Sequence, residues 1–180
     1  MASVLYSAAM SLDGFITGPG GDMSWMVPYL GPNPVVDDLV GRVGSLLVGA
    51  RTFRGDDPYR GTPQEGEAFG GAWHGPQFVL THRPPARPVP GVTFVGDLTS
   101  GLAAARAAAG DRYVNLLGAC VARQCLEAGE LDEVLVTVAP ILLGGGVRLF
   151  DRPEGAGVPL ERLHQSEAGG STNLWFRVVR

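Results

Sequence analysis

The chain has 180 residues, enough for one domain with a sizeable core, and its 45% apolar and 18% charged residues exclude a disordered chain. Its formal net charge is -4 and its basic residues are scattered, so we expect no nucleic-acid partner. No stretch reaches the roughly 20 apolar residues of a membrane span and no signal-peptide pattern is present, so we expect a cytoplasmic protein without a membrane partner.

Residue types rule out several kinds of chemistry. The chain holds 14 arginines and no lysine, which excludes a nucleotide-triphosphatase phosphate loop and a Schiff-base enzyme. It also lacks the GxSxG pattern of serine hydrolases and the GxGxxG fingerprint of dinucleotide-binding folds. Its histidines, His74, His82 and His164, lie far apart in the sequence, so we expect no metal site.

The N-terminal half alternates apolar strands with short helices and glycine-rich loops. Residues 3–9 predict a first strand, and residues 11–25 a long loop with too much glycine for regular structure. Asn33 and Pro34 start a helix that runs to about Gly41, with Pro34 at its first position. We then predict a short buried strand at 46–48, a short helix at 52–54, a surface loop between Gly55 and Gly75, and strands at 77–80 and 92–95.

The second half continues the alternation and then changes to strands alone. Asp97 or Thr99 caps an alanine-rich helix that Gly110 ends, and a strand follows at 113–117. A helix over 119–128 leads into a valine-rich strand at 133–138; its Cys120 and Cys125 point to different faces, so we expect them to pack as small apolar groups rather than to pair. Residues 160–167 and 173–179 predict an antiparallel hairpin joined at 169–171.

This order of elements predicts an α/β fold. Alternating strands and helices favour a mainly parallel central sheet with helices on both faces, and the terminal hairpin adds antiparallel edge strands. The sequence contains no internal repeat and no linker long enough to divide it. We therefore expect a single domain over residues 1–180.

Polar or small residues follow three of the predicted strands directly. Gly49, Arg51 and Thr52 follow the strand at 46–48; Thr81, His82 and Arg83 follow the strand at 77–80; Gly118 and Ala119 follow the strand at 113–117. Ligands of open α/β sheets bind beyond the carboxyl ends of the strands, so the three turns could face one ligand. Guanidinium groups and the first amides of a helix both bind phosphate, which predicts a phosphate-rich ligand.

Each of these residues also has an ordinary structural alternative. Arg51 could form a salt bridge with Asp37 or Asp38, Thr81 could cap a turn, and Arg83, which precedes two prolines, could be solvated. A glycine such as Gly118 often marks a strand-to-helix turn for backbone reasons alone.

With these turns in place, the chain resembles the dihydrofolate reductase superfamily. The resemblance is closer to the branch typified by the C-terminal reductase domain of the bacterial riboflavin-biosynthesis deaminase-reductase. It extends over residues 8–150 as an ordered series of short motifs: Ser11-Leu12-Asp13-Gly14, Asp22-Met23-Ser24-Trp25, residues 47–52, residues 79–83, the Gly118 turn, residues 129–133, and Pro140 to Gly146 ending at Leu149-Phe150.

The resemblance implies a dihydrofolate reductase-like fold, a homodimer, and NADPH as cofactor. It places Gly49, Arg51 and Thr52 near the cofactor phosphates, Thr81, His82 and Arg83 around the adenosine 2'-phosphate, and Gly118 and Ala119 at the pyrophosphate. The cofactor would supply hydride chemistry, while the protein supplies alignment and a dry pocket.

Substrate binding and proton delivery would fall to side chains near the first loop and the first helix. Asp13 and Asp38 are the catalytic candidates, and Asp13, Trp25 and Asp37 are the candidates for contacting a pteridine- or pyrimidine-like substrate. The alternatives are that Asp13 caps an Asp-Gly turn and that Asp37 and Asp38 are solvated helix residues.

Two positions depart from the usual pattern of the branch, and three functions stay open. Leu117 and Ala119 flank Gly118 where further glycines are usual, and Ser24 interrupts an acidic-aromatic pair. The favoured function is reduction of the ribosylaminopyrimidine intermediate of riboflavin biosynthesis, although the zinc-deaminase signature of the bifunctional enzymes is absent. The alternatives are a dihydrofolate or pterin reductase and a non-catalytic nucleotide-binding protein, which crowding by Leu117 would favour.

Overall fold

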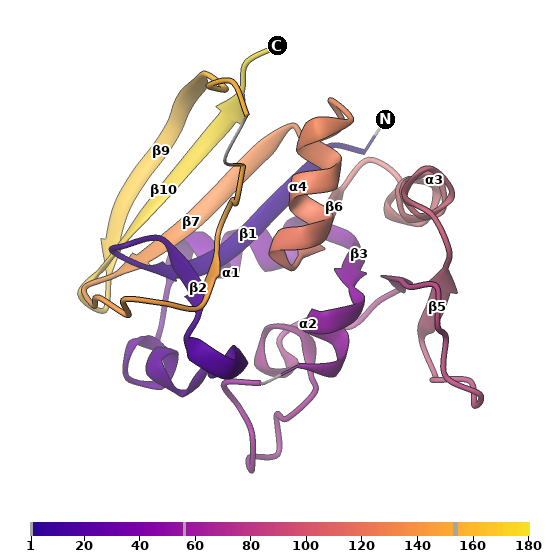
Figure 1. Ribbon diagram of the computed structural model, residues 1–180, viewed down its shortest axis with the longest axis horizontal. Helices are drawn as coiled ribbons and strands as arrows, with labels where there is room; N and C mark the ends of the chain where they lie inside the picture. The colour runs from indigo at the N-terminus through magenta and orange to yellow at the C-terminus, as the bar shows by residue number, and fades with distance from the viewer. Residues whose placement is uncertain (1, 56, 153–154) are drawn as a thin grey trace.

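A computed structural model of the protein describes residues 2–55, 57–152 and 155–180. Its main feature is an eight-stranded sheet in which the first six strands in spatial order run parallel (Figure 1). The last two strands form a hairpin that joins the sheet antiparallel. The predicted mainly parallel sheet with a C-terminal antiparallel hairpin is confirmed. In spatial order the strands are β5 (Val92–Val95), β4 (Gln77–Leu80), β3 (Val43–Gly49), β6 (Tyr113–Leu117), β1 (Val4–Ser11), β7 (Glu133–Ala139), β10 (Ser171–Val178) and β9 (Leu160–Ala168).

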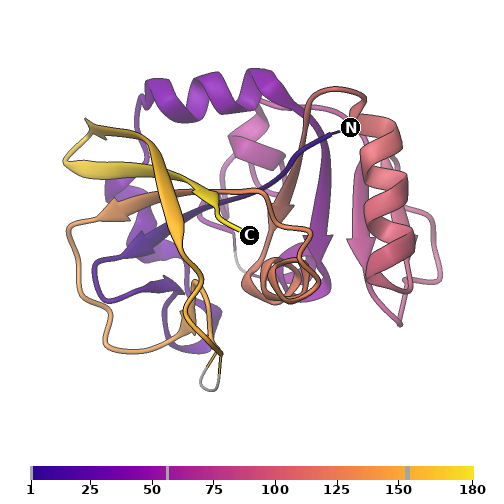
Figure 2. The same cartoon turned by 90° about the horizontal axis from the view of Figure 1, so that it is seen from above.

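Helices cover both faces of the sheet, as predicted. Successive side chains of a strand point to opposite faces. On one face, Leu5 of β1 shares a buried cluster with Leu39 of α1 (Pro34–Arg42). On the other face, Val4 shares a cluster with side chains of α3 (Leu98–Ala109) and α4 (Ala119–Glu127). Figure 2 shows α1 and α4 on opposite sides of the sheet.

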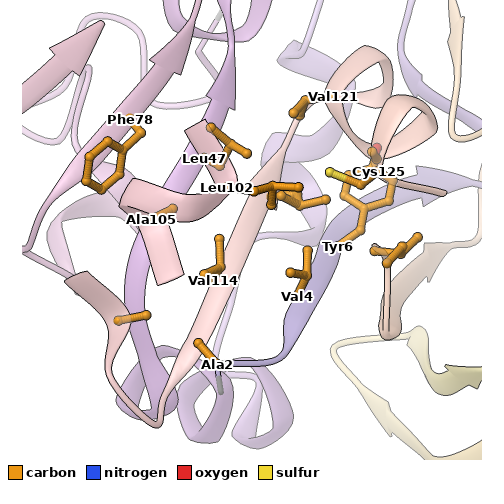
Figure 3. Close-up of a cluster of buried hydrophobic side chains, with 14 of the residues drawn as sticks. Ala2, Val4, Tyr6, Leu47, Phe78, Leu102, Ala105, Val114, Val121 and Cys125 are labelled. Carbon is orange, nitrogen blue, oxygen red and sulfur yellow. The ribbon is translucent and has the colours of Figure 1, made fainter. Parts of the chain in front are cut away.

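The cluster beneath α3 and α4 forms a large part of the core (Figure 3). Val4 and Tyr6 of β1 lie beside Val114 of β6 and meet Leu102 of α3 and Cys125 of α4. Burial of a large apolar side chain contributes about 1.5–3 kcal/mol to stability, so these few residues fix α4 firmly on the sheet. The position of the first turn of α4 is therefore set by the core.

Local signals explain where α3, the longest described helix, begins and ends. The Asp97 carboxylate accepts a hydrogen bond from the Ser100 amide (2.9 Å), which makes Asp97 the N-cap of α3. Gly110 then takes a positive φ of 68°, which ends the helix. In α4, both thiols are free; Cys125 is buried as predicted, whereas Cys120 is exposed, so the prediction that it packs as a small apolar group is wrong. No helix in the described ranges is sufficiently long and apolar to cross a bilayer.

The long loops hold more regular structure than the sequence predicted. Within 11–25, β2 (Phe15–Thr17) pairs antiparallel with β8 (Val147–Arg148), and two 3-10 turns follow, η1 (Pro19–Gly21) and η2 (Ser24–Tyr29). The prediction of an irregular loop over 11–25 is wrong. β2 forms by pairing with β8, which lies about 130 residues further along the chain, so the local sequence gives no sign of it. The loop at 55–75 contains only the 3-10 turn η3 (Ala68–Gly71), and its Asp56 lies outside the described residues.

Candidate active site

A cleft of about 1460 Å³ opens at the carboxyl ends of the parallel strands. The turns after β3, β4 and β6 reach the same edge of the sheet because these strands run in the same direction. The turns contribute Gly49, Arg51, Thr52, Thr81, His82, Gly118 and Ala119 to the lining of the cleft. A site for one small molecule usually measures about 300–1,000 Å³, so this cleft has room for a cofactor and a second ligand.

The cleft has two halves with different construction. The strand-end half is formed by the ends of β3, β4 and β6 and by the starts of α2 (Ala50–Arg54), α3 and α4. The loop half is formed by residues 16–31, by α1 and by the loop at 57–72. Residues of β1, β7 and β10 lie along the floor.

Gly118 shapes the strand-end half because no other residue fits its position. Its φ is +107°, a conformation that side chains disfavour. A Cβ built on it would lie 2.3 Å from Thr52 Oγ1, so the turn before α4 packs directly against α2. The glycine therefore brings two of the strand-end turns into contact.

The first turn of α4 presents unpaired amides to the cleft. The first bond within the helix runs from the Ala122 amide to the Gly118 carbonyl oxygen (3.2 Å). The amides of Ala119, Cys120 and Val121 precede that bond, and all three residues line the cleft. Converging amides and the helix dipole favour an anion at this point.

Of the arginines near the end of β4, Arg54 lines the cleft and Arg83 does not. Arg54 Nη2 donates a hydrogen bond to the Arg83 carbonyl oxygen, which ties α2 to the turn after β4. The Arg83 amide in turn donates to Thr81 Oγ1 (3.1 Å). The sequence singled out Arg83 because it follows the strand directly, and it overlooked Arg54.

His82 lies close to the cap of α3. Hydrogen bonds from the Ser100 amide and hydroxyl hold the pKa of Asp97 below its usual value, and the nearby His82 imidazole adds a smaller effect in the same direction. Arg51 forms no ion pair with Asp37 or Asp38, so that alternative for Arg51 is not observed among the described contacts.

The two adjacent carboxylates of α1 face different sides of the helix. Asp37 lines the cleft, in the loop half. Asp38 forms an ion pair with Arg42 (3.3 Å) and lines a separate groove on the outer side of α1. The sequence analysis named Asp38 as a catalytic candidate and Asp37 as a substrate contact, and the structure places only Asp37 at the cleft.

Asp13 lies outside the lining of the cleft and anchors two loops. Its carboxylate accepts hydrogen bonds from the Ser11 hydroxyl (2.6 Å) and from the amides of Leu143 (3.0 Å) and Gly144 (2.7 Å). These bonds, led by that from Ser11, lower the pKa of Asp13 to about 2. The group is therefore ionised at neutral pH and binds the first loop to the glycine-rich segment after β7.

Trp25 is buried within η2 and does not line the cleft. The residues of this segment that do line it are Met23, Met26, Tyr29 and Leu30. The sequence singled out the tryptophan by its place in a motif, whereas the 3-10 turn directs its neighbours toward the cleft.

Polar groups that the sequence did not single out lie in the floor of the loop half and behind it. Asn173 of β10 is fully buried and exchanges hydrogen bonds with Asn33 (2.9 and 3.1 Å), while Thr137 Oγ1 donates to Asn173 Oδ1 (2.8 Å). The hydroxyls of Thr17 and Ser171 are buried without a hydrogen-bond partner among the described residues, and both residues line the cleft. The Asn33–Asn173 contact joins residues 140 positions apart and the Thr137–Asn173 contact joins residues 36 apart, so no local pattern indicates them.

Leu117, the last residue of β6, also lines the cleft. It packs partly against the buried cluster on the α1 face of the sheet. The leucine thus lies between the strand-end half and the apolar core.

Comparison with known proteins agrees with this architecture. A candidate riboflavin biosynthesis protein of Shewanella sp. PV-4 superposes with a TM-score of 0.75 at 27% identity, with 100% of both chains covered. A diaminohydroxyphosphoribosylaminopyrimidine deaminase/5-amino-6-(5-phosphoribosylamino)uracil reductase of Thermotoga maritima gives 0.68 at 18% identity, with 99% of this chain and 57% of that chain covered. A pyrimidine reductase-like protein of Corynebacterium diphtheriae gives 0.68 at 17% identity, with 99% and 92% covered. The chain thus spans little more than half of the bifunctional Thermotoga protein. No curated protein matches the chain significantly.

The likeness to these structures confirms the dihydrofolate reductase-like fold that the resemblance implied. The family model of the RibD C-terminal domain matches residues 2–174, which is nearly the whole chain. This protein belongs to the family of RibD C-terminal domains.

Proposed function

We propose that this protein is an NADPH-dependent reductase that transfers a hydride to a small heterocyclic substrate. The observation that carries the proposal is the meeting of three strand-end turns and the first turn of α4 at one cleft. Membership in the RibD C-terminal family supports an oxidoreductase, and the named reductases among its structural neighbours support a role in riboflavin biosynthesis.

The strand-end half fits a pyridine dinucleotide. The amides of Ala119, Cys120 and Val121 suit a pyrophosphate, and the absence of a side chain at Gly118 lets Thr52 pack against this turn. Gly49 and Thr52 lie directly beside this turn, because a Cβ on Gly118 would lie 2.3 Å from Thr52 Oγ1 and 3.8 Å from the Gly49 amide nitrogen. The donor set, neutral amides beside guanidinium groups, suits an anion that spans several turns.

The preference for NADPH over NADH would come from the end of β4. Thr81, His82, Arg51 and Arg54 all line this part of the cleft and would surround a 2'-phosphate. Arg83, which the sequence assigned to this role, contributes its carbonyl oxygen to the position of Arg54 instead. The role of Arg83 in the proposal is therefore to position Arg54.

When bound, NADPH would supply the hydride from its reduced nicotinamide ring. The chain would hold the substrate ring against the floor formed by β1 and β7 and keep water away through the apolar loop half. Asp37 is the acid of the first helix that faces this space and is our candidate for moving a proton, directly or through water. Asp38 lies in the separate groove on the outer side of α1, where it pairs with Arg42, so it does not face this space.

Asp13 is a positioning residue in this proposal. Its carboxylate is ionised at neutral pH and engaged by two backbone amides, so it is a poor proton donor. Its contacts fix the loop that leads into β2 and η2, and these elements supply the wall of the loop half.

The substrate named by the Thermotoga relative is 5-amino-6-(5-phosphoribosylamino)uracil, which is the first candidate; dihydrofolate or another pterin is the second. A non-catalytic nucleotide-binding protein is the alternative class, and Leu117 at the cleft is the observation that favours it. Measurement of NADPH oxidation separates the reductase from the non-catalytic alternative, because crowding by Leu117 would permit binding of the nucleotide without hydride transfer.

The test is a fluorescence titration with NADPH, followed by stopped-flow measurement of NADPH oxidation with pyrimidines, pterins and quinones. We expect saturable NADPH binding at submillimolar concentration and oxidation with at least one ring compound. Absence of binding would refute the reductase proposal. Binding without oxidation of NADPH by any compound would favour the non-catalytic alternative.

We also propose a homodimer. The outer strand β9 leaves one edge of the sheet unpaired and carries the exposed Leu160 and Leu163. Exposed apolar edge strands are sites of association. Light scattering that gives the mass of one chain at micromolar concentration would contradict a stable dimer.

A further inference from the structure

We propose that the hydroxyl of Tyr6 is a cofactor-binding group, which donates a hydrogen bond to the carboxamide of the nicotinamide ring when NADPH is bound. This inference rests on the reductase function proposed above and adds a contact for the half of the nucleotide that carries the hydride. Two features of Tyr6 carry it: a buried hydroxyl without a hydrogen-bond partner among the described residues, and a place in the lining of the cleft.

The Tyr6 side chain lies in the core, but its hydroxyl is not paired. Only 1% of the residue is exposed, and Oη has no hydrogen-bond partner in the part of the chain that the structure describes. Buried tyrosine hydroxyls usually have a partner, because an unpaired polar group in apolar surroundings is destabilising. Burial raises the pKa of Tyr6, so the phenol stays protonated at neutral pH and can act as a donor.

The ring of Tyr6 is held in place by its neighbours. Phe150 packs edge-on against it, with ring centroids 5.6 Å apart and an angle of 80° between the ring planes. Val121 and Cys125 of α4 belong to the same buried cluster, and Figure 3 shows the Tyr6 side chain reaching from β1 toward α4. A binding group held in this way loses little conformational freedom when a ligand arrives.

Tyr6 lines the cleft although nearly all of its surface is buried. Ala8 is the next residue of β1 on the same face, because alternate residues of a strand share a face, and it also lines the cleft. Its small side chain leaves the space beyond Tyr6 largely unfilled by β1. Val121 and Gln124 of α4 line the cleft too. A flat polar group that enters the cleft beside Ala8 would therefore come within reach of Oη.

The order of the strands indicates which part of the nucleotide this group belongs to. β3 and β4 lie on one side of β6, and β1 and β7 lie on the other. With the pyrophosphate at the first turn of α4 and the 2'-phosphate at the end of β4, the nicotinamide half extends the opposite way, over β1. Tyr6 lies on β1, on the face of the sheet that α4 covers. The carboxamide is the polar substituent of the nicotinamide ring, and its carbonyl oxygen can accept a hydrogen bond from the phenol.

The alternative partner for the Tyr6 hydroxyl is a permanently buried water molecule. Such a water would make Tyr6 an ordinary core residue, since buried waters commonly pair polar groups inside proteins. The two accounts predict opposite results when the hydroxyl is removed. Loss of a water-paired hydroxyl would destabilise the protein and leave NADPH binding unchanged, whereas loss of an unpaired hydroxyl that binds the cofactor would weaken NADPH binding without destabilising the protein.

The test is Tyr6→Phe, which removes only the hydroxyl. By calorimetry, NADPH should bind about three- to tenfold more weakly, the usual effect of losing one hydrogen bond. The compound 2'-phospho-ADP-ribose has the phosphates of NADPH but no nicotinamide ring, so its affinity should change by less than about twofold. The Tm of the protein without nucleotide should stay the same or rise, because the substitution removes an unpaired buried polar group.

Tyr113→Phe is the matched control. Tyr113 is also a tyrosine of the central sheet with little exposed surface, but its hydroxyl donates to Glu133 Oε2 (3.0 Å) and accepts from Arg42 Nη2 (2.9 Å). It lines the groove on the outer side of α1 and not the cleft. Removal of this paired hydroxyl should lower the Tm by about 2–12 °C and leave the affinities for both nucleotides unchanged.

Unchanged NADPH affinity in the Tyr6→Phe protein, or equal losses for NADPH and 2'-phospho-ADP-ribose, would overturn the inference and leave the reductase proposal intact. A fall in Tm as large as that of Tyr113→Phe would also overturn it, because the hydroxyl would then have a partner in the protein without nucleotide. Failure of the unmodified protein to bind NADPH would instead refute the proposed function, and the inference with it, which separates the two results.

Discussion

Replacement of Gly118 by alanine tests the contact between the turn before α4 and the start of α2. The new Cβ would lie 2.3 Å from Thr52 Oγ1 and 3.3 Å from Thr52 Cβ, whereas ordinary contacts begin near 3.4 Å. One of the two turns must therefore move by about an ångström. The substitution also places a side chain on backbone with a φ of +107°.

The expected loss of stability combines two effects. Unfavourable backbone at positive φ costs about 1–3 kcal/mol, and overpacking costs about 1–3 kcal/mol more. A combined loss of about 2–6 kcal/mol should lower the Tm by about 4–24 °C, at roughly 2–4 °C per kcal/mol for a chain of this size. Thermal and urea unfolding, both followed by circular dichroism, measure this loss.

Gly129→Ala is the matched control. Gly129 also has a positive φ, +71°, but a Cβ there would meet no atom within 4 Å. It should therefore lose only the backbone part, about 1–3 kcal/mol. In a Thr52→Ala background, Gly118→Ala should cost less stability, because removal of Thr52 Oγ1, the atom closest to the new Cβ, removes most of the overpacking.

The Gly118→Ala protein should bind NADPH at least about tenfold more weakly than the unmodified protein, because the turn before α4 leads into the amides that face the cleft. Gly129→Ala should bind it normally, since Gly129 lies beyond the other end of α4. Equal losses of stability in Gly118→Ala and Gly129→Ala would refute the close contact. Unchanged NADPH affinity in a folded Gly118→Ala protein would refute the role of this turn in binding.

Three further predictions concern the arginines, the first loop and the buried amide. Arg54→Ala should weaken NADPH binding about tenfold more than NADH binding. Arg83→Ala should have a smaller effect, because Arg83 contributes a backbone oxygen that the substitution retains. Calorimetry with both nucleotides tests this, and a larger effect of Arg83→Ala would contradict it. The pKa of Asp13 falls from 3.8 to about 2 on folding, so its contribution to stability is present above pH 4 and is lost as the pH falls toward 2. Asp13→Asn should therefore lower stability at pH 7 and flatten the acid dependence of stability measured by urea unfolding. An unchanged pH profile of stability would contradict this prediction. Asn173→Ala should cost about 1–3 kcal/mol of unfolding free energy, because the partly buried Asn33 amide and Thr137 hydroxyl lose their hydrogen-bond partner. A loss below about 0.5 kcal/mol would contradict that account.

The sequence predicted the central parts of the fold because their signals are local. The strand at 113–117 and the helix after Gly118 have clear apolar patterns, a glycine between them, and a second glycine at the end of the helix. The hairpin β9–β10 carries its turn in Gly169 and Gly170. Short elements such as β2 and β8 have no such pattern, because two or three residues cannot show a period.

The sequence also located the strand-end turns correctly but not the direction of individual side chains. Asp37 and Asp38 are neighbours, and adjacent residues of a helix point about 100° apart, so only one of them faces the cleft. Arg54 reaches the end of β4 through a contact with residue 83, which only the folded chain brings near. Asp13 contacts residues 130 positions away, so its anchoring role depends on the fold.

Perturbation of backbone amide resonances by NADPH tests the central claim most directly, which is that the first turn of α4 and the strand-end turns bind this nucleotide. The account predicts large, saturable shifts for the amides of Ala119, Cys120 and Val121, together with those of Thr52 and His82. Shifts confined to other parts of the chain, such as the groove beside Asp38, or no shift at millimolar NADPH, would contradict it.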